Sequence, residues 1–157
     1  ISDYTFSKCI SLTEIKIPGS IREIGYKSFS GCSGLREISI PSTVKTVGIG
    51  AFENCTELKD ISLPTTLTEI NYYTFSGCTS LTTLTLHSKL TAINNYAFAG
   101  CKSLTEIHCK NSNPPLIGEN TFRDVNRIGC KIFVPSKRAK KSYSTALYWN
   151  EFTIYIE

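Results

Sequence analysis

The 157-residue sequence contains no methionine, one tryptophan and two histidines. It has no apolar run near the roughly 20 residues that a membrane-spanning helix requires, and its start lacks the charged and then apolar pattern of an export signal. Positive and negative side chains are nearly balanced, with 17 lysines and arginines against 13 aspartates and glutamates. The overall charge therefore does not indicate a nucleic-acid partner, and we expect none.

Motifs of catalytic and metal sites are also missing. There is no C-x2-C or H-x3-H spacing that would gather zinc ligands, no glycine-rich phosphate loop and no G-x-S-x-G nucleophile turn. His108 and Cys109 are adjacent, but neighbouring strand residues face opposite sides of a sheet and cannot form a base and nucleophile pair. The sequence thus predicts no enzyme, no cofactor and no metal.

A short repeat dominates what the sequence does contain. Its period is 23 residues, the separation of Phe6 from Phe29. Shifting the chain by one period superimposes like residues: Phe6, Phe29, Phe52, Phe75 and Phe98; Cys9, Cys32, Cys55, Cys78 and Cys101; Leu12, Leu35, Leu58, Leu81 and Leu104; and Ile15, Ile38, Ile61, Leu84 and Ile107. A fixed period of this length is typical of solenoids, in which a repeat buries its apolar face only by stacking on its neighbours.

Each repeat is expected to contain two short extended segments and one turn. The pattern L-x-x-I-x-I alternates as a strand does, and the proline after it, as at Pro41, would end the strand because it has no N–H to donate. The next two apolar positions, such as Val44 and Val47, suit a second short extended or turn segment. The remaining piece, around Phe52 and Asn54, is expected to close the coil as one helical turn.

The period also predicts the domain organisation. Residues 1–135 are expected to form about six coils, the sixth degenerate, because Phe122 follows Phe98 by one residue more than the period and Val125 replaces the column cysteine. Residues 136–157 lie beyond the period and are expected to cover the last coil. Within them, Ser136 should cap a helix that runs through about Tyr148 and shares one face among Ala139, Tyr143, Ala146 and Leu147.

Two further expectations concern the first residue and the cysteines. Ile1 falls in the same phase as Ile24, so we expect a fragment of a longer protein. The five periodic cysteines occupy one position per repeat, where in-register side chains point in parallel and keep their β-carbons too far apart for disulfides. They are predicted to be a buried column of free thiols, whereas Cys109 and Cys130 remain undecided.

The repeat I-x4-F-x2-C-x2-L-x2-I-x-I-P, intact in residues 24–41, resembles the BspA-like or treponemal-type leucine-rich repeat family, and residues 134–157 resemble the closing segment of such proteins. The resemblance implies a right-handed leucine-rich repeat solenoid of α/β-type repeat architecture with a C-terminal cap. It also implies an extracellular or cell-surface location on a bacterium, and attachment or host-matrix binding. It supplies no functional residue, because the shared motif is the core.

Candidate binding residues are those that the repeat leaves free. On the sheet face they form three columns, whose candidate members are Glu14, Glu37, Asp60, Thr83 and Glu106; Lys16, Ser39, Ser62, Thr85 and His108; and Arg36 and Lys59. One hypothesis is a surface that binds a protein or a glycan, with host extracellular matrix among the candidate ligands. The alternative for any one residue is a solvated sheet face with weak charge pairing. For the whole domain, the alternative is a structural spacer without a ligand of its own.

Overall fold

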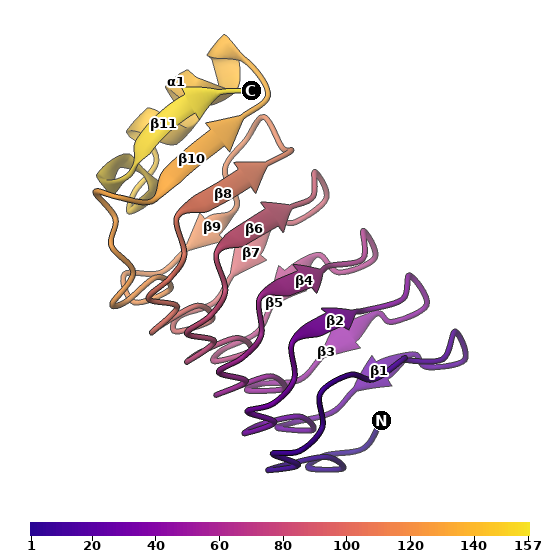
Figure 1. Ribbon diagram of the computed structural model, residues 1–157. Helices are drawn as coiled ribbons and strands as arrows, with labels where there is room; N and C mark the ends of the chain where they lie inside the picture. The colour runs from indigo at the N-terminus through magenta and orange to yellow at the C-terminus, as the bar shows by residue number, and fades with distance from the viewer.

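A computed structural model describes residues 1–157, which wind through about six coils stacked along one axis (Figure 1). We number the coils one to six by Phe6, Phe29, Phe52, Phe75, Phe98 and Phe122. Two rows of short strands run along the stack. The front row in Figure 1 contains β2 (Glu37–Ser39), β4 (Asp60–Ser62), β6 (Thr83–Leu86), β8 (Glu106–Cys109) and β10 (Lys131–Val134), and the back row contains β1 (Glu23–Ile24), β3 (Thr46–Val47), β5 (Glu69–Ile70), β7 (Ala92–Ile93) and β9 (Leu116–Ile117).

All strand pairs are parallel, and their register follows the sequence period. Ile38 pairs with Ile61 in the β2–β4 ladder, and Leu84 pairs with Ile107 in the β6–β8 ladder. Side chains alternate across each strand, so that Ile38 is buried while Glu37 and Ser39 are exposed. The expected two extended segments per coil are confirmed in the second to fifth coils. Residues 14–17 of the first coil form no strand, and the sixth coil contains only β10 before α1 begins.

The phenylalanine column forms a continuous stack through the core. Successive rings from Phe6 to Phe122 have centroids 5.1, 5.1, 5.4, 5.4 and 5.6 Å apart, and their planes differ by 15° at most. The backbone follows the same step, since the amide of Phe52 donates to the carbonyl of Thr74 in the next coil at 2.8 Å. Each coil therefore contributes side-chain stacking and a backbone hydrogen bond to its neighbour.

All seven cysteines are free, as expected for the periodic column, and both Cys109 and Cys130 are buried. In four coils the thiol donates to the phenylalanine carbonyl of the preceding coil, for example Cys55 Sγ to Phe29 O at 3.2 Å. The prediction that the whole column is buried is wrong for Cys9, which is exposed because no coil precedes it in the structure.

The segment expected to close each coil as a helical turn is instead a series of β-turns. In the third coil, Ala51 N donates to Gly48 O, Glu53 N to Gly50 O and Cys55 N to Phe52 O. Gly50 and Asn54 have positive φ values of 63° and 59°, which interrupt the helical conformation between these turns. The chain reverses here without forming a helix.

Residues beyond the sixth coil form α1 (Lys137–Thr145), the 3₁₀-helix η1 (Trp149–Glu151) and β11 (Thr153–Ile156). Ser136 caps α1 as expected, because its hydroxyl accepts a hydrogen bond from Ala139 N. The predicted end near Tyr148 is wrong. The helix stops at Thr145, Tyr148 is left-handed, and Leu147 is exposed rather than on the buried face.

Strand β11 and the buried aromatic side chains attach this segment to the solenoid. β11 extends the front row by pairing in parallel with β10, which the sequence analysis did not predict. The Trp149 indole donates to the Pro115 carbonyl at 2.8 Å and its ring lies 5.7 Å from that of Phe122. The Tyr143 hydroxyl donates to Asn111, whose own amide donates to Leu90 O. We interpret residues 136–157 as a cap over the last coil.

Replacing phenylalanine in the stack should cost more stability inside the solenoid than at its first coil. We expect Phe52→Ala to lower the free energy of unfolding by about 3–5 kcal/mol, since the fully buried ring contacts a ring on either side. Phe6→Ala should cost clearly less, because Phe6 is half-buried and stacks on one ring. Urea unfolding of both variants checks this; equal losses would contradict the stacked core.

Thiol labelling should separate Cys9 from the other six cysteines. Burial raises the pKa of the Cys55, Cys101, Cys109 and Cys130 thiols to about 12, so almost none of each is the reactive thiolate at pH 8. We expect about one equivalent to react with Ellman's reagent in the folded protein and seven after denaturation. The Cys9→Ser variant, as the matched control, should lose the single native equivalent. Two or more missing thiols after denaturation would indicate disulfides.

Candidate binding surface

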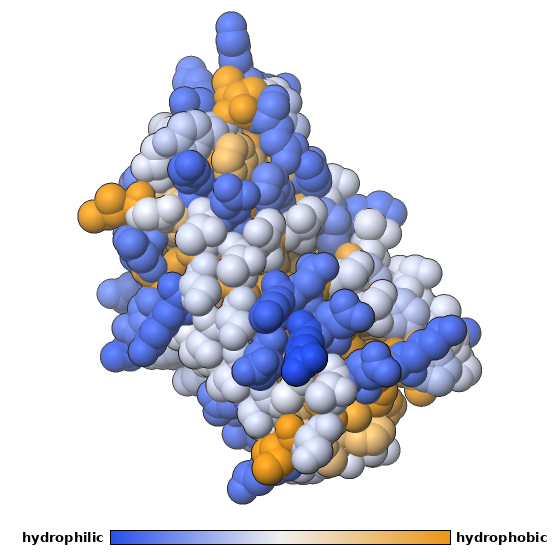
Figure 2. Space-filling model, in the orientation of Figure 1, coloured by the Kyte–Doolittle hydropathy of each residue, from blue (hydrophilic) through white to orange (hydrophobic).

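The predicted site residues lie together on the exposed face of the front row. The strand register aligns Glu37 with Asp60 and Ser39 with Ser62, and further along aligns Thr83 with Glu106 and Thr85 with His108. Glu106 and His108 are half-buried, and the other ten predicted residues are exposed. The face is mostly hydrophilic, as the blue and white surface over the front row in Figure 2 shows. The sequence period thus places the columns correctly.

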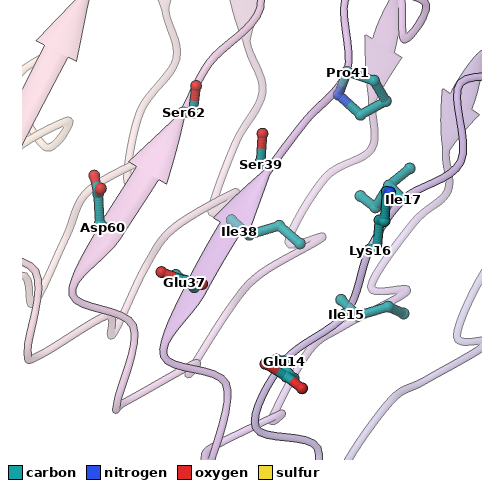
Figure 3. A pocket seen from close by; sticks show the side chains of 10 residues that line it. All are labelled: Glu14, Ile15, Lys16, Ile17, Glu37, Ile38, Ser39, Pro41, Asp60 and Ser62. Atoms are coloured by element: carbon teal, nitrogen blue, oxygen red, sulfur yellow. The ribbon is translucent and has the colours of Figure 1, made fainter.

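The N-terminal half of this face carries an open hollow of about 680 Å³. Three successive coils contribute to it: Glu14, Ile15, Lys16 and Ile17 from the first, Glu37, Ile38, Ser39 and Pro41 from the second, and Asp60 and Ser62 from the third (Figure 3). Half-buried Ile15 supplies its exposed apolar side chain, whereas Ile17 and Ile38 are buried, and charged or hydroxyl side chains provide the rest. Six of the twelve predicted site residues line this hollow.

The hollow carries a negative charge that no other side chain neutralises. Glu14, Glu37 and Asp60 supply three carboxylates against the single ammonium of Lys16, and none of these four groups belongs to an ion pair of the protein. Arg36 does not line the hollow. It lies beside a separate shallow depression with Ile10, Thr13, Ser33, Gly34, Thr56 and Glu57. Unpaired carboxylates favour a ligand that presents cationic groups.

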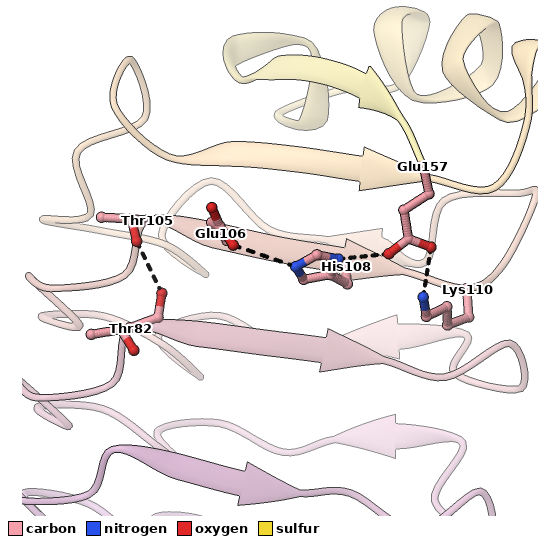
Figure 4. A network of polar contacts seen from close by, with 6 residues as sticks. All are labelled: Thr82, Thr105, Glu106, His108, Lys110 and Glu157. Atoms are coloured by element: carbon pink, nitrogen blue, oxygen red, sulfur yellow. Dashed lines mark hydrogen bonds and ion pairs between the residues drawn. The ribbon is translucent and has the colours of Figure 1, made fainter.

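The C-terminal end of the face holds a polar network that the sequence analysis missed. Glu157 accepts from Lys110 Nζ at 2.6 Å and contacts His108 Nδ1 at 2.6 Å, while His108 Nε2 lies 3.6 Å from a Glu106 oxygen (Figure 4). The pKa of the Glu157 carboxyl is lowered from its ordinary value, first by the hydrogen bond from Lys110 and then by that with His108. Glu157 lies outside the repeat, so no periodicity could have placed it here.

Two aromatic rings extend the His108 column, Phe133 of the sixth coil and Tyr155 of β11. The His108 ring stacks on Phe133 at 4.8 Å, and Phe133 lies 5.7 Å from Tyr155 of β11. The in-register pairing of His108 with Phe133 and of Phe133 with Tyr155 produces this stack. Thr83 and Thr85 lie between this end and the hollow.

Other candidate chemistry is not assembled. Cys109 is fully buried and its thiol pKa is raised to about 12 by burial, whereas the neighbouring His108 lies on the sheet face. No three His, Cys, Asp or Glu side chains converge as metal ligands would. None of the helices has the length and apolar character to cross a membrane.

The fold and this surface define a class of protein, a parallel β-solenoid of leucine-rich repeats whose core is uniform and whose sheet face varies from coil to coil. The family model described as the BspA type leucine rich repeat region matches residues 1–133 in six copies. The chain therefore belongs to the BspA-type leucine-rich repeat family, as its repeat predicts. A search of curated proteins finds no match.

Solved bacterial structures share the fold. A leucine-rich cell surface protein from Faecalibacterium prausnitzii is 29% identical over 88% of this chain, with a TM-score of 0.71. A leucine-rich repeat protein from Bacteroides ovatus is 26% identical over 99% of the chain (TM-score 0.65), and the T. pallidum leucine-rich repeat protein is 31% identical over 69% (TM-score 0.66). The chain spans 34%, 42% and 50% of the lengths of these three proteins.

The Glu157 network should make stability depend on pH in a defined direction. A carboxyl with a lowered pKa in the folded state contributes stability above its unfolded value, and this contribution disappears as the pH falls through the folded value. Wild type should therefore melt at a higher temperature than Glu157→Gln above about pH 5, and the two should converge toward pH 3. Thermal melts across this range check it. A difference that persists unchanged at the acidic end would contradict the network.

Proposed function

We propose that this domain is a non-enzymatic binding module of a bacterial cell surface and that its sheet face engages a protein ligand. The observation that carries the proposal is the hollow in Figure 3, where three coils together present three carboxylates that belong to no ion pair of the protein. A protein segment that presents lysine or arginine side chains would complement these carboxylates. Host extracellular-matrix proteins are the candidate ligands that we expect first, and a glycan ligand is the other form of the hypothesis.

Family and relatives support the cell-surface part of this proposal. Leucine-rich repeat proteins generally bind other proteins through a solenoid surface. The similar protein from F. prausnitzii is described as a cell surface protein. A location outside the cell gives the exposed face access to extracellular ligands.

A spacer role is the second candidate, and the middle of the sheet face favours it. Thr82, Thr83 and Thr85 supply only short, uncharged side chains there, and the hollow does not extend over them. A spacer would hold other parts of a longer protein apart, and the domain alone would bind nothing saturably. The same binding experiment separates the two candidates.

Neutralising the hollow should abolish ligand binding without unfolding the domain. Wild type is first tested on an array of matrix proteins and glycans to find the matrix proteins that it binds. We expect the triple variant Glu14→Gln, Glu37→Gln and Asp60→Asn to lose binding to those proteins. Because the three side chains are exposed and unpaired, the melting temperature should stay within a few degrees of wild type.

The matched control removes the same number of charges elsewhere. Glu23, Glu57 and Glu119 are exposed carboxylates outside the hollow and outside ion pairs, and their replacement by glutamine should leave binding unchanged. Binding that survives the hollow variant would contradict the sheet-face proposal. A wild-type domain that binds nothing saturably on the array would favour the spacer.

A further inference from the structure

A second surface lies on another side of the coil, where the back-row strands lead into the β-turns. Two columns meet there, one containing Tyr26, Ile49 and Tyr72, and the other containing Tyr4, Lys27, Gly50, Tyr73 and Tyr96. We name Tyr4, Tyr26, Ile49, Tyr72, Tyr73 and Tyr96 the tyrosine stripe. Five of them are 37–54% exposed, and these five are nearly half of the eleven large apolar or aromatic side chains that the protein exposes. The repeat pattern of the core does not account for this concentration.

The backbone conformation of three of these tyrosines indicates that they do not stabilise the turn in which they lie. Tyr4, Tyr73 and Tyr96 have φ values of 57°, 59° and 63°, in the left-handed region that is unfavourable for bulky side chains. The same column has glycine at Gly50, which adopts this conformation freely.

A second left-handed column four residues further on provides the comparison. Its members are Lys8, Gly31, Asn54, Gly77 and Gly100, so that four of the five are residue types that tolerate the conformation. One left-handed position per coil therefore has residues suited to its backbone, while the other has tyrosine in three coils of five. Strained residues of this kind are typical of functional sites.

The rings are arranged so that part of the stripe is open. The rings of Tyr73 and Tyr96 are parallel, with centroids 4.9 Å apart, and this stacking covers one face of Tyr73. The column neighbour on its other side is Gly50, which has no side chain of its own, although the Lys27 side chain passes over it toward Glu53, and Tyr73 remains 38% exposed. Tyr72, 45% exposed, lies in the adjacent column next to Ile49. Tyr72, Tyr73, Ile49 and Gly50 thus form an aromatic platform over the third and fourth coils.

Few charged groups lie around the stripe, and those without an ion-pair partner include Asp3, which accepts a hydrogen bond from Tyr26 N, and Glu69, which accepts one from Asn94. The Lys27 ammonium pairs with Glu53 at 3.2 Å and lies 5.7 Å from the Tyr26 ring centroid, so its charge is locally compensated. Asn71, Asn94 and Asn95 border the tyrosines, and each uses one end of its side-chain amide within the protein. The other end of each amide keeps hydrogen-bonding capacity for a ligand.

We propose that the tyrosine stripe binds a neutral polysaccharide that lies along the solenoid axis. Sugar rings present an apolar C–H face that stacks on aromatic rings and a hydroxyl edge that bonds to amides and tyrosine hydroxyls. The stripe offers both, repeated from coil to coil, and its one cationic side chain, Lys27, is already paired with Glu53, so that it does not favour an acidic partner. Tyrosine also provides a large contact area with little loss of conformational freedom. This surface is separate from the hollow, so the domain would engage two ligands at once.

The test removes the aromatic rings of the platform at two positions where the substitution should not unfold the protein. Tyr73→Gly replaces a strained residue by the one that suits its backbone, and Tyr72→Ala removes an exposed ring. Wild type should be retarded in native gels containing at least one of four soluble neutral polysaccharides: β-glucan, xylan, mannan or galactan. Calorimetry on that polysaccharide should show a roughly tenfold loss of affinity for each ring removed, while the melting temperature falls by no more than a few degrees.

Two control variants distinguish polysaccharide binding by the stripe from ligand binding by the sheet face. Ile128→Ala with Leu147→Ala removes two exposed apolar side chains outside the stripe and should leave retardation unchanged. The hollow variant with Glu14, Glu37 and Asp60 neutralised should also be retarded normally. The proposal is overturned if wild type is retarded by none of the four polysaccharides, if Tyr73→Gly binds as wild type does, or if loss of the stripe abolishes binding to matrix proteins alone.

Discussion

Stacking of one coil on the next is the interaction on which this structure depends. A single coil has strands of only two to four residues and cannot enclose its own apolar side chains. Neighbouring coils supply the missing contacts through the phenylalanine stack, the thiol-to-carbonyl bonds and the parallel backbone ladder. Stability is then a sum of contributions from each coil and each contact between coils.

This constraint separates the residues available for binding from those that build the scaffold. Positions such as Phe52, Cys55 and Leu58 are fixed by the need to match their neighbours in adjacent coils. Side chains that point outward carry no such requirement, and they differ from coil to coil on the sheet face and along the tyrosine stripe. A solenoid of this kind can change its ligand without changing its core.

The sequence predicts the repeating parts of the molecule well, because a constant period fixes which side chains share a column. Ile38 and Ile61, or Ser39 and Ser62, are neighbours for that reason alone. Features that break or lie outside the period could not be obtained in this way. Glu157 meets His108 across 49 residues, and α1 ends at Thr145 because Ala146 turns to an extended conformation. The left-handed positions themselves, which reveal the tyrosine stripe, require backbone angles.

Native-state hydrogen exchange, read by mass spectrometry coil by coil, tests the stacking account most directly. The amides of Phe6 and Phe52 make equivalent bonds, to Ser28 O at 2.7 Å and to Thr74 O at 2.8 Å, but only the coil of Phe52 has a coil on either side. Stacking predicts that amides of the third to fifth coils exchange much more slowly than those of the first. Equal protection of the first and fourth coils would show that stability does not arise from contacts between coils.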